Sequence, residues 1–240
     1  MNAGLTGEAR GDDDAQRVPQ PTRVARSVAR FARPTPRLAG VYDASDPRCE
    51  KIRALRTELL LRREPGDGAE VIALLSPGTG DGRSQLAAEL AIAFAQLDRP
   101  TLLVDADLRH PSQHLLFAAD NKAGLSQAIA HGTTPYFQPV EGLRHLSLLT
   151  AGPTPDNALE LLLNRRFAAL VEECRESFDF VVLDTAPITE YSDGLAVASL
   201  IKRVLVLSRA RHTPYKESRD MLRRLAAIRS QIVGAVINHF

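Results

Sequence analysis

The sequence predicts an α/β domain with a mostly parallel β-sheet that is flanked by helices on both faces. Short, continuously apolar segments such as Val71–Ser76 and Phe180–Asp184 alternate with longer segments of helical periodicity. Strands that are apolar along their whole length are typical of a parallel sheet buried on both faces. The chain has 240 residues, 44% of them hydrophobic, which is enough for one such domain with a buried core.

The first predicted helix begins near Asp46 and Pro47, because Asp46 fits an N-cap and Pro47 fits the first helical turn. Its apolar stripe runs from Ile52 to Leu60, and Pro65 ends it. The further predicted strands are Val71–Ser76, Thr101–Asp105, Leu146–Leu149, Phe180–Asp184, Val204–Ser208 and Ile232–Ile237, and the further helices are Ser84–Leu97, Asn157–Leu163, Arg166–Ser177 and Lys216–Ile228.

Residues 1–40 differ in composition from the rest, and we expect them to form a disordered tail ahead of a folded domain at 41–240. Thr22–Arg37 contains five arginines and no acidic residue, and Pro34 and Pro36 interrupt it. The five arginines recur at helical spacing, so an alternative is a basic arm that docks to anionic lipid or an acidic partner. They are Arg23, Arg26, Arg30, Arg33 and Arg37.

The overall composition excludes several classes of protein. A net charge of +1 gives no overall field that favours nucleic acid, and no nucleic-acid partner is expected. Cys49 and Cys174 are far apart, which argues against a disulfide framework or a zinc site. The apolar segments are too short to cross a bilayer, and the acidic N-terminus does not look like a secretory signal. We therefore expect a cytoplasmic protein whose membrane contact is indirect.

A glycine-rich segment, Ser76–Ser84, lies between a predicted buried strand and a predicted helix. Glycines allow a tight turn whose N–H groups point at phosphate oxygens, and the helix N-terminus adds a favourable dipole. A glycine-rich turn that binds no nucleotide remains the alternative. The segment predicts a phosphate-binding loop, with Ser84 placed to join a Mg²⁺ shell.

Acidic residues follow two of the predicted strands. Asp105 and Asp107 come at the end of one strand, and Asp184 ends another. In a parallel sheet, such strand ends meet beside the phosphate loop. Carboxylates at that position bind Mg²⁺ directly or through water, although a single acid there is often only a turn residue.

With these motifs in order, the chain resembles the cytoplasmic bacterial tyrosine kinases, which have a P-loop ATPase fold of the deviant-Walker type. The phosphate loop resembles their Walker A motif, and Leu103–Asp107 with the following Leu108–Pro111 resembles their second Walker-type motif. Val181–Asp184 resembles their Walker B motif, and Ile232–Asn238 resembles their closing strand. The similarity covers roughly Val41 to Phe240 and is greatest to the exopolysaccharide chain-length-determinant branch.

The resemblance implies phosphoryl transfer from ATP, with Mg²⁺ held by Ser84, Asp105 and Asp184. Asp107 would orient or deprotonate an attacking tyrosine hydroxyl, and Arg83 and Asp105 would complete the catalytic set. It also implies that ATP is bound by Gly78, Thr79, Gly80, Asp81, Gly82, Arg83, Ser84, Gln85 and Asn238.

The resemblance also implies a homo-oligomer, with a ring as its form. Glu50, Arg53 and Arg56 fit the E-x-x-R-x-x-R pattern by which the family assembles. This spacing places the charges along one helix face, where arginines can pair with a neighbour's carboxylates. Without the family, the same pattern would be read as a solvated face. A membrane-embedded polysaccharide co-polymerase is the implied second partner.

Two features depart from the family pattern. Arg83 stands where lysine reaches the phosphates, and a planar guanidinium cannot place the same point charge there. Family kinases end in a tyrosine cluster, whereas the four tyrosines of this chain are scattered. We therefore expect weak kinase activity, no phosphorylation of a C-terminal tail, and an acceptor on a partner or at a tyrosine such as Tyr42. The tyrosines are Tyr42, Tyr136, Tyr191 and Tyr215.

Two alternatives to an active kinase follow from these departures. The first is a nucleotide-gated scaffold of the same polysaccharide machinery, which binds ATP but transfers no phosphate. The second is a positioning or partitioning ATPase. That class carries a signature lysine early in the phosphate loop, and Pro77–Gly80 contains none.

Overall fold

A computed structural model of the chain describes residues 31–41, 43, 45–63 and 68–239. The strands in this part are β1 (Glu70–Leu75), β2 (Thr101–Asp105), β3 (Gln138–Val140), β4 (Leu143–Leu149), β5 (Phe180–Asp184), β6 (Arg203–Arg209) and β7 (Gln231–Asn238). The helices are η1 (Pro36–Val41, a 3-10 helix), α1 (Pro47–Leu61), α2 (Arg83–Ala95), α3 (Gln113–Leu116), α4 (Leu125–His131), α5 (Ala158–Leu162), α6 (Arg165–Ser177), α7 (Asp193–Ile201) and α8 (Tyr215–Ala227).

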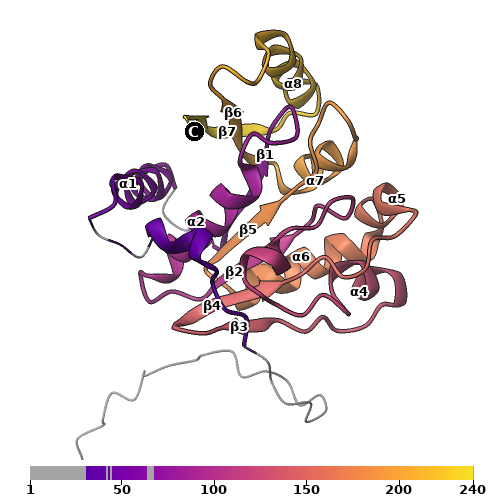
Figure 1. Ribbon diagram of the computed structural model, residues 1–240. Helices are drawn as coiled ribbons and strands as arrows, with labels where there is room; N and C mark the ends of the chain where they lie inside the picture. The colour runs from indigo at the N-terminus through magenta and orange to yellow at the C-terminus, as the bar shows by residue number, and fades with distance from the viewer. Residues whose placement is uncertain (1–30, 42, 44, 64–67, 240) are drawn as a thin grey trace, which may run out of the picture.

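The strands form a seven-stranded sheet in the order β3-β4-β2-β5-β1-β6-β7. All described neighbours are parallel except β3 and β4 (Figure 1). The predicted fold class is therefore confirmed. The carboxyl ends of β1, β2 and β5, which are neighbours at the centre of the sheet, open toward the same edge.

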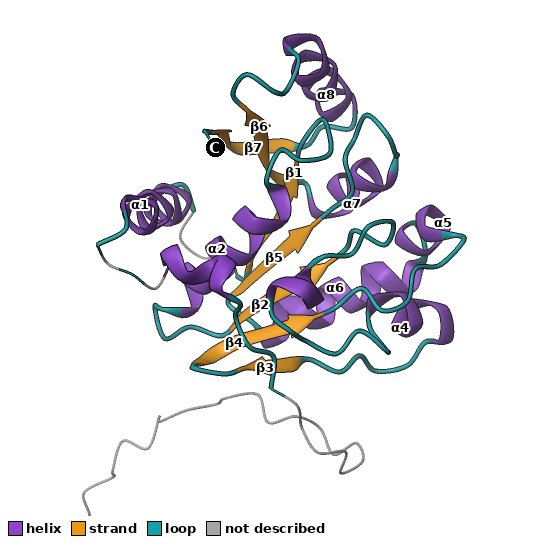
Figure 2. Ribbon diagram, viewed as in Figure 1, coloured by secondary structure: helices purple, strands orange, loops and turns teal. Residues whose placement is uncertain are grey.

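Helices cover both faces of the sheet, as Figure 2 shows. Alternate residues of the central strands feed two separate apolar cores, because successive side chains of a strand point to opposite faces. One core packs against α1, α2 and α3, and the other against α4 to α8. In the first core, the rings of Phe94 on α2 and Phe180 on β5 stack with centroids 4.2 Å apart.

Helix α1 begins as its sequence predicts. The Asp46 side chain accepts a hydrogen bond of 2.8 Å from the Arg48 N–H, and Pro47 is the first helical residue. The helix packs mainly on α2 and η1 and lies apart from the sheet in Figure 1. One bidentate ion pair joins it to α2, because the Arg48 guanidinium donates to both carboxylate oxygens of the buried Glu89, at 2.7 and 2.8 Å.

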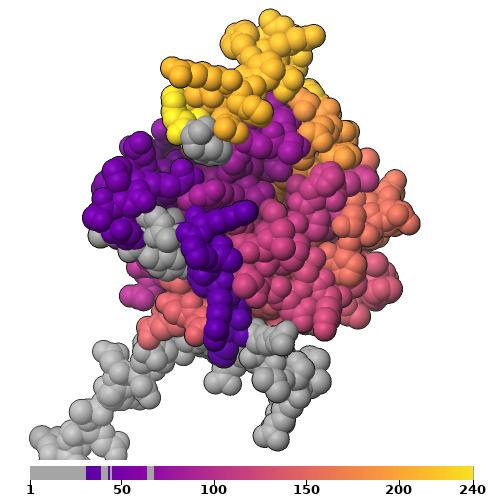
Figure 3. Space-filling view, viewed as in Figure 1, coloured from indigo at the N-terminus to yellow at the C-terminus, as the bar shows by residue number. Residues whose placement is uncertain are grey.

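Part of the segment 1–40 contacts the domain at residues 32–38, whereas the predicted domain boundary at residue 41 stays a prediction. Ala32 forms a bridge with Val140 of β3, and its N–H donates to Pro139 O at 3.0 Å. Ala32 and Leu38 are fully buried. Backbone hydrogen bonds and these two buried side chains therefore hold this segment against the domain, although its arginines and prolines suggested a disordered tail. It runs across the molecular face in Figure 3. The predicted tail at 1–30 lies outside the described residues.

Among the described elements, β3, α3, α4, α7 and the 3-10 helix η1 were not predicted from the sequence. The first three have three, four and seven residues, too few for a periodic pattern to be recognised. α7 is apolar on nearly all sides, because it lies between the sheet and neighbouring helices, and six of its nine residues are buried. A helix buried in this way lacks the polar face on which a sequence prediction depends.

Candidate nucleotide and phosphoryl-transfer site

The predicted phosphate loop connects β1 to α2 at the carboxyl edge of the sheet. Gly80 and Gly82 have φ angles of +83° and +92°, a left-handed conformation that glycine adopts without strain. α2 is 13 residues long and begins at Arg83, within the last residues of the loop segment. A strand, a glycine turn and a helix N-terminus therefore stand in the order that a phosphate site needs.

Two predicted nucleotide-binding residues hold the loop itself. The Asp81 carboxylate accepts from the Gly78 N–H at 3.0 Å and from the Thr213 hydroxyl at 2.6 Å. Asn238, at the end of β7, donates from Nδ2 to the Asp81 carbonyl at 3.1 Å. In this conformation Asp81 and Asn238 fix the outer side of the loop, so the predicted contact between Asn238 and the base stays a prediction.

The Arg83 side chain is directed at the acids and not at the loop backbone. Its guanidinium donates to Ser76 Oγ at 2.6 Å, to Asp184 Oδ1 at 3.3 Å and to Asp107 Oδ2 at 3.3 Å. The arginine is 7% exposed. The cation that was expected to reach phosphate therefore neutralises two buried carboxylates in this conformation.

Asp105 and Asp184 are direct neighbours in the register of β2 and β5. Burial raises the pKa of Asp105 well above its ordinary value, and the charge of Asp184 raises it further, against the hydrogen bonds from the Gln113 and Ser112 N–H groups. Burial also raises the pKa of Asp184, although Arg83 and a hydrogen bond from Ser84 oppose the shift. The two carboxylates therefore need positive charge nearby to remain ionised together.

Asp107 follows β2 and anchors the segment beyond it. Its Oδ1 accepts from the backbone N–H groups of Arg109 and His110, at 3.2 and 2.9 Å, while Oδ2 faces Arg83. The structure thus brings together Arg83, Asp105, Asp107 and Asp184, as the sequence predicted, and the Ser84 hydroxyl joins them at Asp184.

Gln113 belongs to this cluster and was not predicted from the sequence. It is fully buried, and its Nε2 donates to Asp184 Oδ2 at 2.8 Å and to the Ser84 carbonyl at 2.9 Å. Its Oε1 is buried without a hydrogen-bond partner among the described residues. Gln113 lies eight residues after Asp105, at the start of the four-residue helix α3, so no sequence spacing marked it.

The donor set fits Mg²⁺. The Asp105 and Asp184 carboxylates and the Ser84 hydroxyl supply oxygen ligands, and because burial raises the pKa of both acids, a nearby cation would stabilise their ionised forms. Within the described ranges, no group of three or more His, Cys, Asp or Glu side chains forms a metal cage. Two carboxylates and a hydroxyl agree with that finding, because Mg²⁺ in nucleotide sites retains several waters.

A rim of polar and aromatic side chains lies beside Asp107. The His110 Nε2 is 3.3 Å from the Tyr191 hydroxyl, and the Arg109 guanidinium carbon is 5.1 Å from the Tyr191 ring centroid. Arg109 also donates to both oxygens of Asp193, at 2.8 and 3.3 Å. Tyr191 and Asp193 come from the end of the β5–α7 loop and the start of α7, so the rim joins the segments that follow β2 and β5.

The β5–α7 loop is fastened to the phosphate loop. The Ile188 N–H donates to the Ser76 carbonyl at 3.1 Å, and both the N–H and the hydroxyl of Thr189 donate to the Pro77 carbonyl, at 3.0 and 2.7 Å. The Thr79 hydroxyl donates to Glu190 Oε1 at 2.6 Å. These contacts fix the residues just before Tyr191 against the start of the phosphate loop.

The three predicted interface residues on α1 have different surroundings. Glu50 and Arg53 form an exposed ion pair at 4.0 Å, with 78% and 39% of their side chains exposed. Arg56 is partly buried and donates to the Ala93 carbonyl of α2 at 2.9 Å. Burial, followed by the charge of Arg53, lowers the pKa of Arg56. Glu50 and Arg53 are therefore available to another subunit, whereas one donor of Arg56 is used within its own chain.

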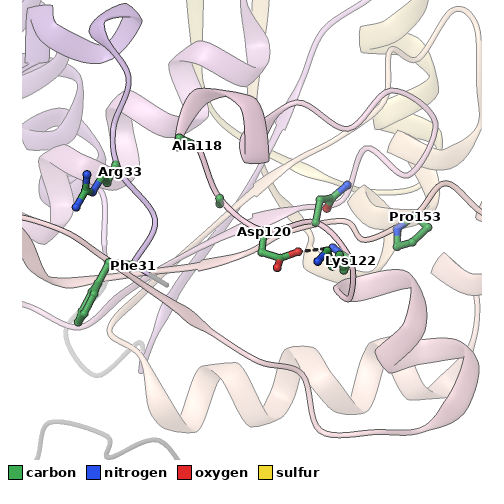
Figure 4. A pocket seen from close by; sticks show the side chains of 8 residues that line it. Phe31, Arg33, Ala118, Asp120, Lys122 and Pro153 are labelled. Carbon is green, nitrogen blue, oxygen red and sulfur yellow. Dashed lines mark hydrogen bonds between the residues drawn. The ribbon is translucent and has the colours of Figure 1, made fainter. Parts of the chain in front are cut away.

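A separate hollow of about 860 Å³ has no residue of the phosphate loop in its lining, and Figure 4 shows it from close by. Phe31 and Arg33 of the packed N-terminal segment form one side, and Asp120 and Lys122 form another. None of the predicted nucleotide or metal residues lines it. Its lining consists of Phe31, Arg33, Ala118, Ala119, Asp120, Asn121, Lys122 and Pro153.

The fold and the site together define a P-loop nucleoside-triphosphatase domain. The family model named ParA, described as NUBPL iron-transfer P-loop NTPase, matches residues 68–239. Tyrosine-protein kinase YwqD of Bacillus subtilis is 32% identical over 192 residues, covering 79% of this chain and 80% of the relative. Within this class, the chain belongs to the bacterial tyrosine-protein kinase family.

Another relative is much longer than this chain. Tyrosine-protein kinase etk of Escherichia coli K12 is 31% identical over 201 residues, which cover 82% of this chain and 27% of the relative. The solved kinase domain of Escherichia coli ETK has a TM-score of 0.79 at 29% identity, covering 86% of this chain and 80% of that structure. The chain thus corresponds to the kinase domain of the longer relative. In the described part of this chain, no helix has both the length and the apolar character needed to cross a membrane.

Proposed function

We propose that this chain binds ATP and Mg²⁺, transfers the γ-phosphoryl group to tyrosine, and thereby regulates exopolysaccharide polymerisation, chain length and export. The observation that carries the proposal is the convergence of Arg83, Asp105, Asp107 and Asp184 beside the phosphate loop. The polysaccharide context comes from the family resemblance of the sequence. A homo-oligomer and a membrane-embedded polysaccharide co-polymerase are the proposed partners, and the latter would bring a cytoplasmic domain to the inner membrane.

The proposed roles follow from position. Residues 78–85 would hold the phosphates at the start of α2, and Asn238 is the candidate for a contact with the base. Ser84, Asp105 and Asp184 would hold Mg²⁺, which would neutralise phosphate charge when bound. Asp107 would orient the acceptor hydroxyl, either directly or through the Arg109–His110 backbone that it fixes.

Arg83 has to change partners for this function. In the described conformation its guanidinium lies against Asp107 and Asp184, so contact with a phosphate requires it to leave at least one carboxylate. Binding of Mg²⁺ at Asp184 would compensate for that loss. Lysine keeps the charge but makes fewer fixed hydrogen bonds, so Arg83→Lys should bind Mg·ATP more tightly than the wild type.

The same contacts favour a second candidate function, a nucleotide-gated scaffold that transfers no phosphate. An arginine held by Ser76, Asp107 and Asp184 is a stable resting arrangement, and nucleotide binding could change assembly without chemistry. A positioning ATPase is not favoured by any contact in the described part of the chain.

Calorimetry with Mg·ATP, followed by a phosphotyrosine assay on the same sample, separates these functions. Asp184→Ala, which removes a metal ligand, is the control for binding. Binding with phosphotyrosine supports the kinase, whereas binding without it, also in the presence of the co-polymerase segment, supports the scaffold. Absence of binding by both wild type and Arg83→Lys would refute both proposals.

A further inference from the structure

Tyr191 lies near the end of the β5–α7 loop, which is fastened to the phosphate loop, and its hydroxyl contacts the segment that follows β2. Its preceding neighbour Glu190 accepts a hydrogen bond from Thr79 of that loop at 2.6 Å. Its own hydroxyl is 3.3 Å from His110, whose backbone N–H is held by Asp107 at 2.9 Å. The phenol therefore belongs to the same small region as the residues that would hold the terminal phosphate and the acid that would orient an acceptor.

The groups around the Tyr191 hydroxyl suit it to act as a nucleophile. In the tautomer protonated at Nδ1, His110 Nε2 accepts the phenolic hydrogen and can take the proton when the oxygen attacks. The two rings are tilted by 51°, with centroids 6.0 Å apart, so the imidazole meets the hydroxyl from the side and does not stack over the ring. His110 Nε2 and the Tyr191 hydroxyl oxygen are 3.3 Å apart, and a bound nucleotide can shorten this distance.

The Arg109 guanidinium provides positive charge beside the same ring. It is held over Tyr191 at 5.1 Å by its bidentate pair with Asp193, a residue that is almost fully buried. A phosphate group on Tyr191 would carry nearly two negative charges. Arg109 is placed to form an ion pair with this phosphate. The new pair would draw Arg109 away from Asp193 at the start of α7.

We propose that Tyr191 is a phosphate acceptor of this kinase and that it is modified within its own subunit. The inference rests on the proposed function. Tyr191 Oη forms a bond to the γ-phosphorus of ATP as the bond from that phosphorus to the β,γ-bridging oxygen breaks. ADP leaves with the bridging oxygen, and the phenolic proton passes to His110 Nε2 and then to solvent.

The other described tyrosines lack these neighbours. Tyr136 lies in the α4–β3 connection and is 52% exposed, and Tyr215 at the start of α8 is 79% exposed. The guanidinium carbon against the Tyr215 ring, at 6.0 Å, belongs to Arg219 on the same helix. Tyr42, which the sequence suggested as an acceptor, lies outside the described residues. Tyr191 is therefore the tyrosine of the described chain that contacts the segment beyond β2.

Trypsin places the four tyrosines of the chain on four different peptides, so peptide mapping can show which tyrosine carries phosphate. The peptides 38–48, 123–144, 176–202 and 212–216 each contain one tyrosine, and Tyr191 is in 176–202. The full chain is incubated with Mg·ATP, digested, and mapped by fragmentation mass spectrometry. A glutamate–tyrosine copolymer in a parallel reaction reports kinase activity that does not depend on Tyr191.

The expected result is phosphate on Tyr191, with a first-order rate constant that does not change with protein concentration. Tyr191→Phe should remove this phosphate, Tyr215→Phe should leave its rate unchanged, and His110→Ala should slow it by roughly 100-fold. Copolymer labelling with Tyr191 unmodified would overturn the inference and leave the proposed function standing. A rate constant proportional to protein concentration would overturn modification within the subunit. If neither substrate is labelled, the proposed function fails and the inference fails with it.

Discussion

Replacement of Arg83 by alanine removes the guanidinium that lies between Asp107 and Asp184. The three side chains are 8%, 4% and 0% exposed, so the two carboxylates would be left buried without their cation. Removal of one partner from a buried ion pair costs roughly 3–5 kcal/mol. Both nitrogen–oxygen distances are 3.3 Å, longer than in the strongest charge-assisted bonds, which places the expected loss near the lower limit, about 3 kcal/mol.

The predicted change is large enough to measure by thermal unfolding. For a domain of this size, a loss of about 3 kcal/mol lowers the Tm by about 6–12 °C. The measurement is made in a chelating buffer at neutral pH, so that no divalent cation replaces the guanidinium. Saturating Mg²⁺ should return part of the loss, because a cation at Asp105 and Asp184 supplies the missing positive charge.

A double-mutant cycle with Asp184→Asn tests the reasoning directly. Asparagine keeps the shape of Asp184 without its charge, so Arg83→Ala should cost much less in the Asp184→Asn background. The coupling energy between two contacting charges should lie at about 1–3 kcal/mol. If the two substitutions are additive, or if Arg83→Ala changes the Tm by less than about 2 °C, the guanidinium does not hold these acids together.

Three further predictions concern α1, α3 and α6. If the proposed oligomer assembles through α1, Arg53→Glu should dissociate it in light scattering with unchanged unfolding, and an intact Arg53→Glu oligomer would exclude this surface. Arg56→Ala should lose about 1–3 kcal/mol of stability, because it leaves the Ala93 carbonyl unpaired. Burial lowers the pKa of His114, so the unfolded chain binds its proton more readily, and the free energy of unfolding should fall as the pH drops below about 6.5. Urea titrations of His114→Gln should show a flatter pH dependence, and an identical slope would contradict the assignment. Burial raises the pKa of the Cys174 thiol to about 12, so iodoacetamide should label it, as detected by mass spectrometry, only after denaturation; rapid labelling of the native protein would show that α6 opens.

The sequence predicted the central strands closely, and physical reasons explain why. β2 and β5 have the predicted limits, because each is a continuous apolar run that ends in an acid at the sheet edge. The N-terminus of α1 was also predictable, since Asp46 and Pro47 satisfy the backbone requirements of a helix start locally. The short helix α3 was not predictable, because its four residues are stabilised by contacts from distant parts of the chain.

The composition of the site was predictable, but the direction of its side chains was not. Motif order placed Arg83, Asp105, Asp107 and Asp184 near one another, since parallel strands end at one edge. Whether Arg83 faces phosphate or carboxylate depends on the charges around it, which only the folded arrangement brings together. Gln113 was not predicted for the same reason. What marks it as part of the site is its hydrogen bond to Asp184, which lies 71 residues away in sequence.

Helix α2 connects the phosphate loop to helix α1. Its first residue is Arg83 of the phosphate loop, and Glu89 and Ala93 further along contact Arg48 and Arg56 of α1. A helix of 13 residues is a rod of about 20 Å, so a shift of its first turn also moves the α1 surface. If bound nucleotide changes the affinity of the subunits for one another, thermodynamic reciprocity requires assembly to change the affinity for nucleotide by the same factor. Nucleotide affinity would then depend on the concentration of the protein itself.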